Sequence, residues 1–203
     1  FFSRDQLAAE EPRLANPSET VRGEVGVAGV AEGAALAAAG PDGSLIAEKT
    51  KSKRATCAIA RSASPIAAEK IGRGRGKLSI IGTGPGSEQW LSPQAVSLLK
   101  SASDWVGYGL YLDLVDKYAA GKEQHRFPLG EEEARVRHAL ELAGTGKDVA
   151  LISSGDTGIY AMAALAFELL DPETSPPLSE GARRVAIEVA PGISAFQAAA
   201  ARA

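Results

Sequence analysis

Three times in its second half, the chain passes from a short apolar segment into a glycine-containing loop and then into a helical pattern. The loops are Gly82 to Ser87 (GTGPGS), Ser153 to Gly158 (SSGDTG) and Ala190 to Ala195 (APGISA). A buried strand, a tight turn and a helix form one βα unit, and repeated units build a parallel sheet covered by helices. The second half is therefore predicted to be a doubly wound, mainly parallel α/β sheet.

Apolar periodicity assigns the individual elements of this half. We expect strands at 78–82, 104–107, 148–152 and 184–189, and helices at 93–102, 110–119, 131–143 and 159–170. His125 and Arg126 are expected in the loop after the second of these helices. Because the carboxyl ends of parallel strands meet at one edge, the three glycine loops are predicted to line one small-molecule site. Each loop alone is equally typical of a plain tight turn.

Composition excludes several classes of protein. The 203 residues are 45% hydrophobic, and the net charge of −3 gives no case for nucleic-acid binding. Apolar runs are too interrupted for a membrane span. Cys57 is the single cysteine, so no intrachain disulfide forms and a cytoplasmic location is expected. We interpret Cys57 as a small core residue of a strand, and no spacing suggests metal ligands.

The first part of the chain has a different character. Residues 1–62 are predicted to be part of a small α/β domain, with a helix at 30–39 and strands at 45–47 and 56–60; residues 63–76 are predicted to be a linker, and 77–203 a second domain. Residues 1–76 hold 11 Lys and Arg against 9 Asp and Glu, whereas residues 77–203 hold 11 against 16. The first residue is Phe and the last residues form a helical pattern, so we expect a fragment of a longer protein.

The segments IGTGPGS, SSGDTGIYAM and VAPGISAFQAAAA resemble the tetrapyrrole methylases of cobalamin and sirohaem biosynthesis. The VGY and FPLGEEEAR segments resemble the precorrin-3B C17-methyltransferases in particular. The resemblance implies methylation of precorrin-3B at C17 with ring contraction, S-adenosylmethionine as methyl donor, a homodimer, and a second α/β domain beyond residue 203. Without that domain we expect no turnover. The alternatives are a sibling methylase acting at another carbon and a non-catalytic docking module.

The same resemblance implies the site residues. The cofactor-binding set is Pro85, Ser154, Gly155, Asp156, Ile159, Ser194 and Ala195, and the candidates for the tetrapyrrole face are Gly84, Gly86, Tyr108, Tyr111 and Arg126. Asp156 has two open roles, pairing with the methionine ammonium group or holding an Asx turn. Arg135, Arg137 and His138 are interpreted as a solvated helix face paired with Glu131 to Glu133. Binding of substrate carboxylates is the alternative for the two arginines. No catalytic residue is identified.

The N-terminal part carries a resemblance of its own. Its segments NPSE, VAEGAAL and TCAIAR resemble the end of the G/E-type domain of cobalamin biosynthesis. Full-length G-type proteins of that kind are linked to opening of the cobalt-precorrin-5A lactone. The resemblance therefore implies a fusion of two corrin-pathway domains, of which the first is incomplete.

Overall fold

The computed structural model describes residues 1–68, 71–159, 162–171, 173 and 176–202. The chain folds into two units, Phe1–Arg73 and Gly74–Ala203. Each unit contains one β-sheet, with two strands in the first unit and five in the second among the described residues.

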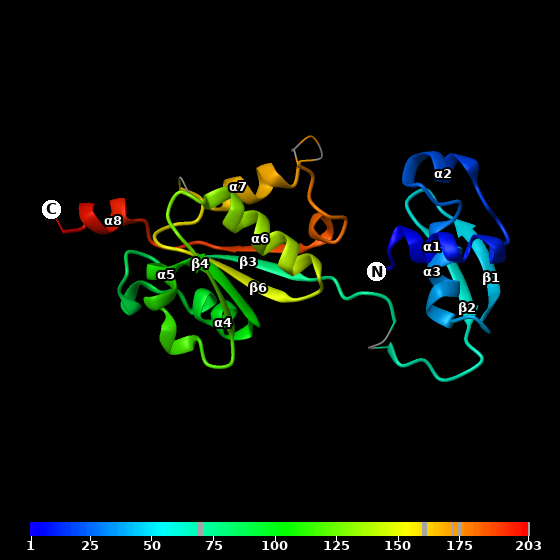
Figure 1. The fold of residues 1–203 in the computed structure, drawn as a ribbon, viewed down its shortest axis with the longest axis horizontal. Coiled ribbons are helices and arrows are strands. Elements are labelled where there is room, and N and C mark those ends of the chain that lie inside the picture. The colour runs from blue at the N-terminus through cyan, green and yellow to red at the C-terminus, as the bar shows by residue number, and fades with distance from the viewer. Residues whose placement is uncertain (69–70, 160–161, 172, 174–175, 203) are drawn as a thin grey trace. The chain divides into compact units, whose positions relative to one another are not determined.

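The first unit packs short helices on an antiparallel hairpin. Its elements are α1 (Arg4–Ala9), η1 (Glu11–Arg13), α2 (Glu19–Val25), α3 (Val30–Ala39), β1 (Ser44–Lys51) and β2 (Thr56–Arg61). A capping box between Ser3 and Gln6 begins α1, and the Ser18 hydroxyl caps α2. Helix α3, which has the predicted bounds, packs on both strands (Figure 1).

A buried carboxylate ties this unit together. Glu32 of α3 is 1% exposed, and it accepts hydrogen bonds from the backbone amides of Ala15, Asn16 and Lys49 and from the Asn16 side chain at 2.8–3.0 Å. Burial raises the pKa of Glu32, but these hydrogen bonds outweigh burial and leave the pKa below its ordinary value. A fully bonded carboxylate of this kind is a structural group.

The interpretation of Cys57 as a core residue is wrong. Cys57 is exposed on β2, as is Ile59, whereas Ala58 and Ala60 are half-buried. Successive side chains of a strand point to opposite faces, and α3 packs on one face of this two-stranded sheet. Cys57 lies on the other face.

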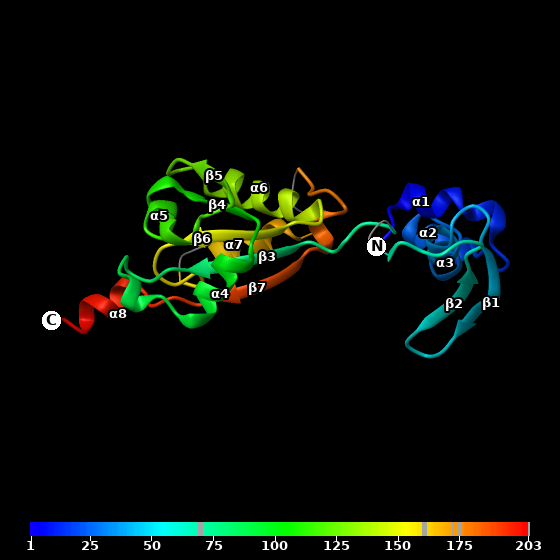
Figure 2. The ribbon, with the colours of Figure 1, turned by 90° about the horizontal axis from the view of Figure 1, so that it is seen from below.

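The second unit is the predicted parallel α/β sheet. Its strands are β3 (Lys77–Gly82), β4 (Asp104–Tyr108), β5 (Glu123–Phe127), β6 (Asp148–Ser153) and β7 (Ala186–Ala190). They lie in the order β5-β4-β6-β3-β7, and every pair is parallel. Figure 2 shows this order across the sheet. Strand β3 lies between β6 and β7, so the three glycine loops leave neighbouring strands.

Helices cover both faces of this sheet, as Figure 1 shows. They are α4 (Pro93–Ser101), α5 (Gly109–Asp113), α6 (Glu132–Gly144), α7 (Met162–Leu169) and α8 (Ala195–Ala200), with the short η3 (Glu88–Trp90), η4 (Asp116–Tyr118) and η5 (Ala182–Arg184). Val136, Leu140 and Ala166 of α6 and α7 pack on one face of the sheet. Leu99 and Leu112 of α4 and α5 pack on the other face around Trp105. The two cores make the sheet a rigid base for its loops.

Some elements differ from the prediction. The strand expected at 184–189 begins at Ala186, after the turn η5, and the strand expected at 45–47 extends over Ser44–Lys51. The segment around His125 and Arg126, expected to be a loop, is strand β5. Its sequence EQHRF lacks an apolar run because β5 is an edge strand, paired with β4 on one side. The helix expected at 110–119 ends at Asp113 and is followed by the turn η4. The start of the helix expected at 159–170 includes residues 160–161, which lie outside the described residues.

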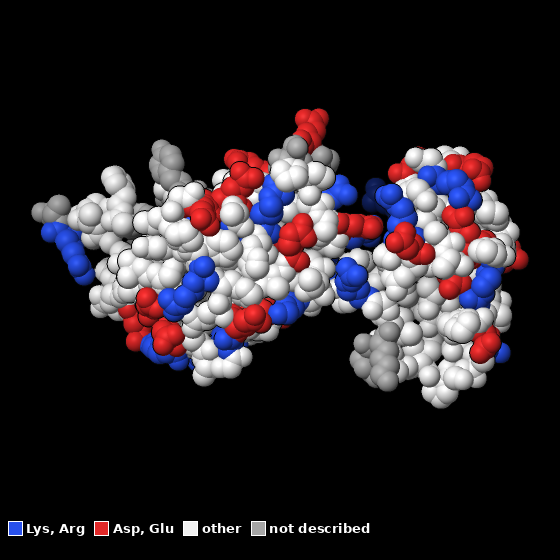
Figure 3. All heavy atoms as spheres, viewed as in Figure 1, with Lys and Arg blue, Asp and Glu red and all other residues white. Residues whose placement is uncertain are grey.

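The surface of each unit carries both signs of charge. Figure 3 shows Lys and Arg interspersed with Asp and Glu on the face that it presents. On α6, Arg137 pairs with Glu133 at 3.3 Å, as the spacing predicts. None of the described helices is long and apolar enough to cross a membrane.

Candidate functional site

The glycine loops after β3 and β6 are joined by backbone hydrogen bonds. Gly84 and Gly155 exchange amide-to-carbonyl bonds of 3.2 and 2.8 Å as an isolated antiparallel bridge. The amide and the hydroxyl of Thr83 both donate to the Ser153 carbonyl, at 2.9 and 3.0 Å. The two loops therefore form one structural piece at the carboxyl edge of the sheet.

The loop after β7 packs against this piece with no room for side chains. A Cβ added to Gly82 would lie 2.6 Å from the Gly155 carbonyl oxygen and 2.7 Å from the Gly192 nitrogen, and a Cβ on Gly192 would overlap the same Gly155 oxygen. Gly155 also has φ of +64°, a conformation that favours glycine. Glycine at these three positions lets three backbones touch.

Asp156 holds the loops together through its side chain. Its Oδ1 accepts from the Gly158 amide at 2.7 Å, which makes an Asx turn, and its Oδ2 accepts from the Gly192 amide at 3.2 Å. Both carboxylate oxygens are therefore used by the protein backbone. Of the two roles left open by the sequence, this geometry supports the structural one.

A cleft of about 540 Å³ lies beside these loops. Its lining includes Ser154, Gly155, Asp156, Ile159, Ser194 and Ala195, which are six of the seven residues predicted to bind the cofactor. Tyr111, predicted for the tetrapyrrole face, also lines it. The Ser194 hydroxyl accepts from the Gln197 amide and begins α8, so one wall of the cleft is a capped helix terminus.

The remaining predicted residues lie elsewhere. Pro85 is exposed and is not part of the cleft lining, and Gly84 is buried in the bridge to Gly155. Tyr108 packs edge-on against Tyr111 with ring centroids 5.2 Å apart. Arg126, on the edge strand, is ion-paired with Asp113 at 2.8 Å. The structure therefore brings the predicted cofactor residues together more completely than the predicted substrate residues.

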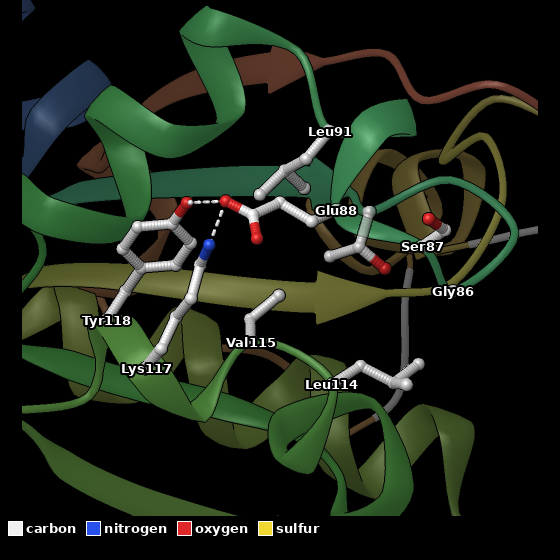
Figure 4. Close-up of a pocket in the computed structure, with 9 residues that line it drawn as sticks. Gly86, Ser87, Glu88, Leu91, Leu114, Val115, Lys117 and Tyr118 are labelled. Atoms are coloured by element: carbon white, nitrogen blue, oxygen red, sulfur yellow. Dashed lines mark hydrogen bonds and ion pairs between the residues drawn. The ribbon is translucent and has the colours of Figure 1, made fainter.

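Gly86 lines a second, much smaller hollow of about 20 Å³. Figure 4 shows that Glu88 reaches across this hollow to Lys117 and Tyr118, above the side chains of Leu114 and Val115. Glu88 is ion-paired with Lys117 and accepts from the Tyr118 hydroxyl at 3.4 Å. These contacts link the loop after β3 to η4.

Three buried polar groups lie near the cleft; the sequence names Arg135 as an alternative candidate for substrate carboxylates and assigns no individual role to Ser153 or Thr157. Arg135 Nε, Ser153 Oγ and Thr157 Oγ1 are buried and have no hydrogen-bond partner in the part of the chain that the structure describes. Arg135 and Ser153 line the cleft. The expectation that Arg135 belongs to a solvated face is wrong, because only 3% of the residue is exposed. The signal was its spacing, four residues before Ala139 of the apolar stripe.

A second polar cluster lies at the opposite, amino edge of the sheet. Asp104 is 2% exposed and accepts from Lys147 at 2.7 Å and from Ser103 at 2.6 Å. Its Oδ1 lies 3.3 Å from His125 Nε2, and His125 Nδ1 lies 3.1 Å from His138 Nε2. Asp104, Glu123 and His125 bring ligand atoms within 4.8 Å of one another, but Lys147 already neutralises Asp104. We interpret the cluster as an ion-pair network.

This network changes two pKa values. Burial raises the pKa of Asp104, but the hydrogen bonds from Lys147, Ser103 and His125 outweigh burial and lower the pKa. Burial, together with the neighbouring His125, lowers the pKa of His138. A lower pKa favours the neutral form of His138.

Comparisons with known proteins agree with the fold and the loops. Residues 77–203 match the family model of the tetrapyrrole (corrin/porphyrin) methylases, and residues 1–60 match the model of the cobalamin synthesis G C-terminus. The chain is 40% identical over 123 residues to a probable cobalt-factor III C(17)-methyltransferase of Salmonella typhimurium, covering 61% of this chain and 48% of that protein. It is 33% identical over 131 residues to a precorrin-3B C(17)-methyltransferase of a Sinorhizobium species, covering 63% and 48%.

A solved structure is also similar. The crystal structure of the methyltransferase CobJ matches with a TM-score of 0.55 and 37% identity, over 63% of this chain and 51% of that one. The chain thus spans about half the length of the relatives that it matches. The family model covers more than half of the chain, including all three glycine loops and the cleft. The chain therefore belongs to the tetrapyrrole (corrin/porphyrin) methylases.

Proposed function

We propose that the protein takes part in S-adenosylmethionine-dependent methylation of precorrin-3B at C17, with ring contraction, in cobalamin biosynthesis. The observation that carries the proposal is the cleft at the carboxyl edge, lined by the loops of a methylase family. The names of the Salmonella and Sinorhizobium relatives support C17 as the position. Since the chain covers 48% of each, the activity is proposed for the whole protein to which it belongs.

The chemistry of the cleft fits a methyl donor. S-Adenosylmethionine supplies an electrophilic methyl group on a sulfonium, so the protein needs to align groups and exclude water rather than supply a nucleophile. A cleft of about 540 Å³ is within the range of small-molecule sites. The Ser153 hydroxyl, unpartnered among the described residues, offers polar contact, and the exposed Ile159 offers an apolar one. These features suit a ligand with both polar and apolar parts.

Individual roles follow from this proposal. Ser154, Gly155, Ile159, Ser194 and Ala195 would contact the donor, while Asp156 would fix the loops. Tyr111, at the cleft, is the best placed of the residues proposed for the macrocycle. Gly84, Pro85 and Gly86 would form a backbone wall beside the cleft, and Tyr108 and Arg126 would lie farther out.

A cobalt-containing substrate is a second candidate. The Salmonella relative is named for cobalt-factor III, and so is a protein of Priestia megaterium that is 35% identical over 129 residues. A sibling reaction at another carbon and a docking role are less favoured, because the names of the Salmonella and Sinorhizobium relatives agree on C17.

The N-terminal unit is proposed to be a fused corrin-pathway domain, because residues 1–60 match the family model of the cobalamin synthesis G C-terminus.

We also propose that the protein is a homodimer and lies in the cytoplasm. Sedimentation equilibrium of the purified protein checks the dimer, and a monomer at micromolar concentration would contradict it.

Methyl transfer is tested with the full natural reading frame that contains this chain. The protein is incubated with methyl-labelled S-adenosylmethionine and either precorrin-3B or cobalt-factor III, and label in the corrinoid fraction is counted. Label with one macrocycle identifies the substrate, and the product spectrum locates the new methyl at C17. No label with either macrocycle would contradict the proposal. The 203-residue chain alone is expected to give none.

A further inference from the structure

Arg135 occupies an unusual position for a cation. It is the fourth residue of α6, in the first turn of the helix, where the helix dipole disfavours positive charge. Its side chain is 4% exposed, and its ion pair is with Glu132 at 2.9 Å. Its Nε has no hydrogen-bond partner among the described residues. Helix electrostatics and burial both oppose this placement, so fold stability alone does not explain it.

Arg137 provides the contrast on the same helix. It pairs with Glu133 at 3.3 Å and donates to the Pro176 carbonyl at 2.8 Å, and its side chain is 21% exposed. Arg137 therefore behaves as an ordinary partly solvated arginine with its donors in use. Two residues earlier, Arg135 lines the cleft, and its Nε donates to none of the described residues.

The surroundings of Arg135 point to a ligand. Arg135 lines the cleft together with Ser153 and Ser154, and the buried Ser153 hydroxyl also lacks a partner in the described part of the chain. Buried polar groups are nearly always hydrogen-bonded, so two such groups on one cleft indicate donors that a bound molecule completes. A guanidinium matches a carboxylate in charge and in planar geometry. Glu132 already neutralises part of the charge, so one further carboxylate oxygen at Nε suffices.

We propose that Arg135 binds a ligand carboxylate in this cleft and so positions that ligand for methyl transfer. This inference rests on the proposed function and names one recognition element of the same site. The carboxylate has two possible sources, the methionine portion of the donor and the acidic side chains of the macrocycle. Both offer the same chemistry to Arg135, and binding measurements separate them.

The test compares Arg135→Met with wild type in the full natural reading frame, using Arg137→Met as the matched control. Calorimetry measures the Kd of S-adenosylhomocysteine and of methylthioadenosine, which lacks the amino-acid portion. If the donor carboxylate is the partner, Arg135→Met raises the Kd of S-adenosylhomocysteine about tenfold or more and leaves that of methylthioadenosine unchanged. A purely structural role would weaken both ligands equally, and that result would overturn the inference.

The second arm measures methyl transfer. If a macrocycle carboxylate is the partner, Arg135→Met raises the KM for the corrinoid about tenfold, with a smaller change in kcat. Arg135→Lys, which keeps the charge and loses the planar fork, is expected between wild type and Arg135→Met, and it replaces Arg135→Met if that variant does not fold. Unchanged Kd and KM in the folded variant would overturn the inference while methyl transfer stands. Absence of methyl transfer in wild type would instead overturn the proposed function, and calorimetry with S-adenosylhomocysteine and with the corrinoid itself would still decide the role of Arg135.

Discussion

At the residue scale, Asp156 shows how a charged group in a ligand cleft can serve the backbone. Its two oxygens accept from Gly158 and Gly192 on two different loops. Asp156 thus fixes the positions of the two loops that line the cleft, and this role requires no contact between its carboxylate and the ligand. The same residue type in the same loop would look identical in sequence if it paired with an ammonium group.

Substitutions at Asp156 separate these roles. Asp156→Asn keeps an acceptor for the Gly158 amide, whereas Asp156→Ala loses both bonds. We expect Asp156→Ala to weaken S-adenosylhomocysteine binding about tenfold or more and Asp156→Asn to weaken it clearly less. Calorimetry on both variants measures the difference. Equal losses in the two variants would indicate a charge contact with the ligand instead.

His138 gives the second unit a pH dependence. Its pKa lies below 6.5 in the folded chain because of burial and the neighbouring His125, so the unfolded chain binds a proton that the folded chain resists. The stability that comes from neutral His138 is fully present above the pKa that His138 has in the unfolded chain. It is lost as the pH falls toward the lower pKa that His138 has in the folded chain. We expect the free energy of unfolding to decrease between about pH 7 and about pH 5, and to decrease less in His138→Gln. Urea unfolding at both values checks this, and parallel losses would refute it.

At the element scale, helix α3 contains one glycine that alanine can replace, Gly33, and ends at one that alanine cannot replace without strain, Gly40. Gly33 lies inside the helix, and an added Cβ would make ordinary contacts of 3.5 and 3.6 Å with Leu7. Gly40 ends the helix with φ +83° and ψ −179°, a region that side chains avoid. We expect Gly33→Ala to stabilise the first unit by about 0.5–1 kcal/mol and Gly40→Ala to destabilise it by about 1–3 kcal/mol. Thermal unfolding of the two variants measures both, and a loss in Gly33→Ala would show that the Leu7 contact is too tight.

The same scale shows what the sequence predicts and what it does not. Strands β3, β4 and β6 carry apolar runs because helices cover both faces, and the predicted bounds of all three agree with the structure within one residue at each end. Strand β5 is not predicted from the sequence, because an edge strand does not require a run of apolar residues. Arg135 is wrongly assigned because its charge and its spacing from Glu131 to Glu133 favour a solvated face, whereas its spacing of four residues from Ala139 places it on the buried face. The cleft residues follow from the order of the loops, but Pro85 and Arg126 lie outside it.

At the scale of the whole molecule, the boundary between the two units is open to a direct test. Arg75 belongs to the second unit and donates to the carbonyls of Arg184 and Val185 at 2.7 and 3.4 Å. The Gly76 carbonyl accepts from Ala186 at 2.9 Å. These bonds anchor the start of β3 to the strand beside it.

We expect a chain of residues 74–203 to unfold at the same urea concentration as the second unit of the full chain. A chain of residues 77–203 lacks the Arg75 and Gly76 bonds, and it should be less stable by about 1–3 kcal/mol. Urea unfolding followed by circular dichroism compares the two. A lower midpoint for residues 74–203 would show that the first unit supports the second.

The contact among Gly82, Gly155 and Gly192 also limits how the site can vary. A side chain at Gly82 or Gly192 displaces the backbone of its partners, so the effects of substitutions there cannot be additive. The three loops are separated by up to 110 residues of sequence, from 82 to 192, but a substitution at this contact in one of them affects the others. Grafting one loop from a relative would require the other two as well, whereas Pro85, outside this contact, can be exchanged alone.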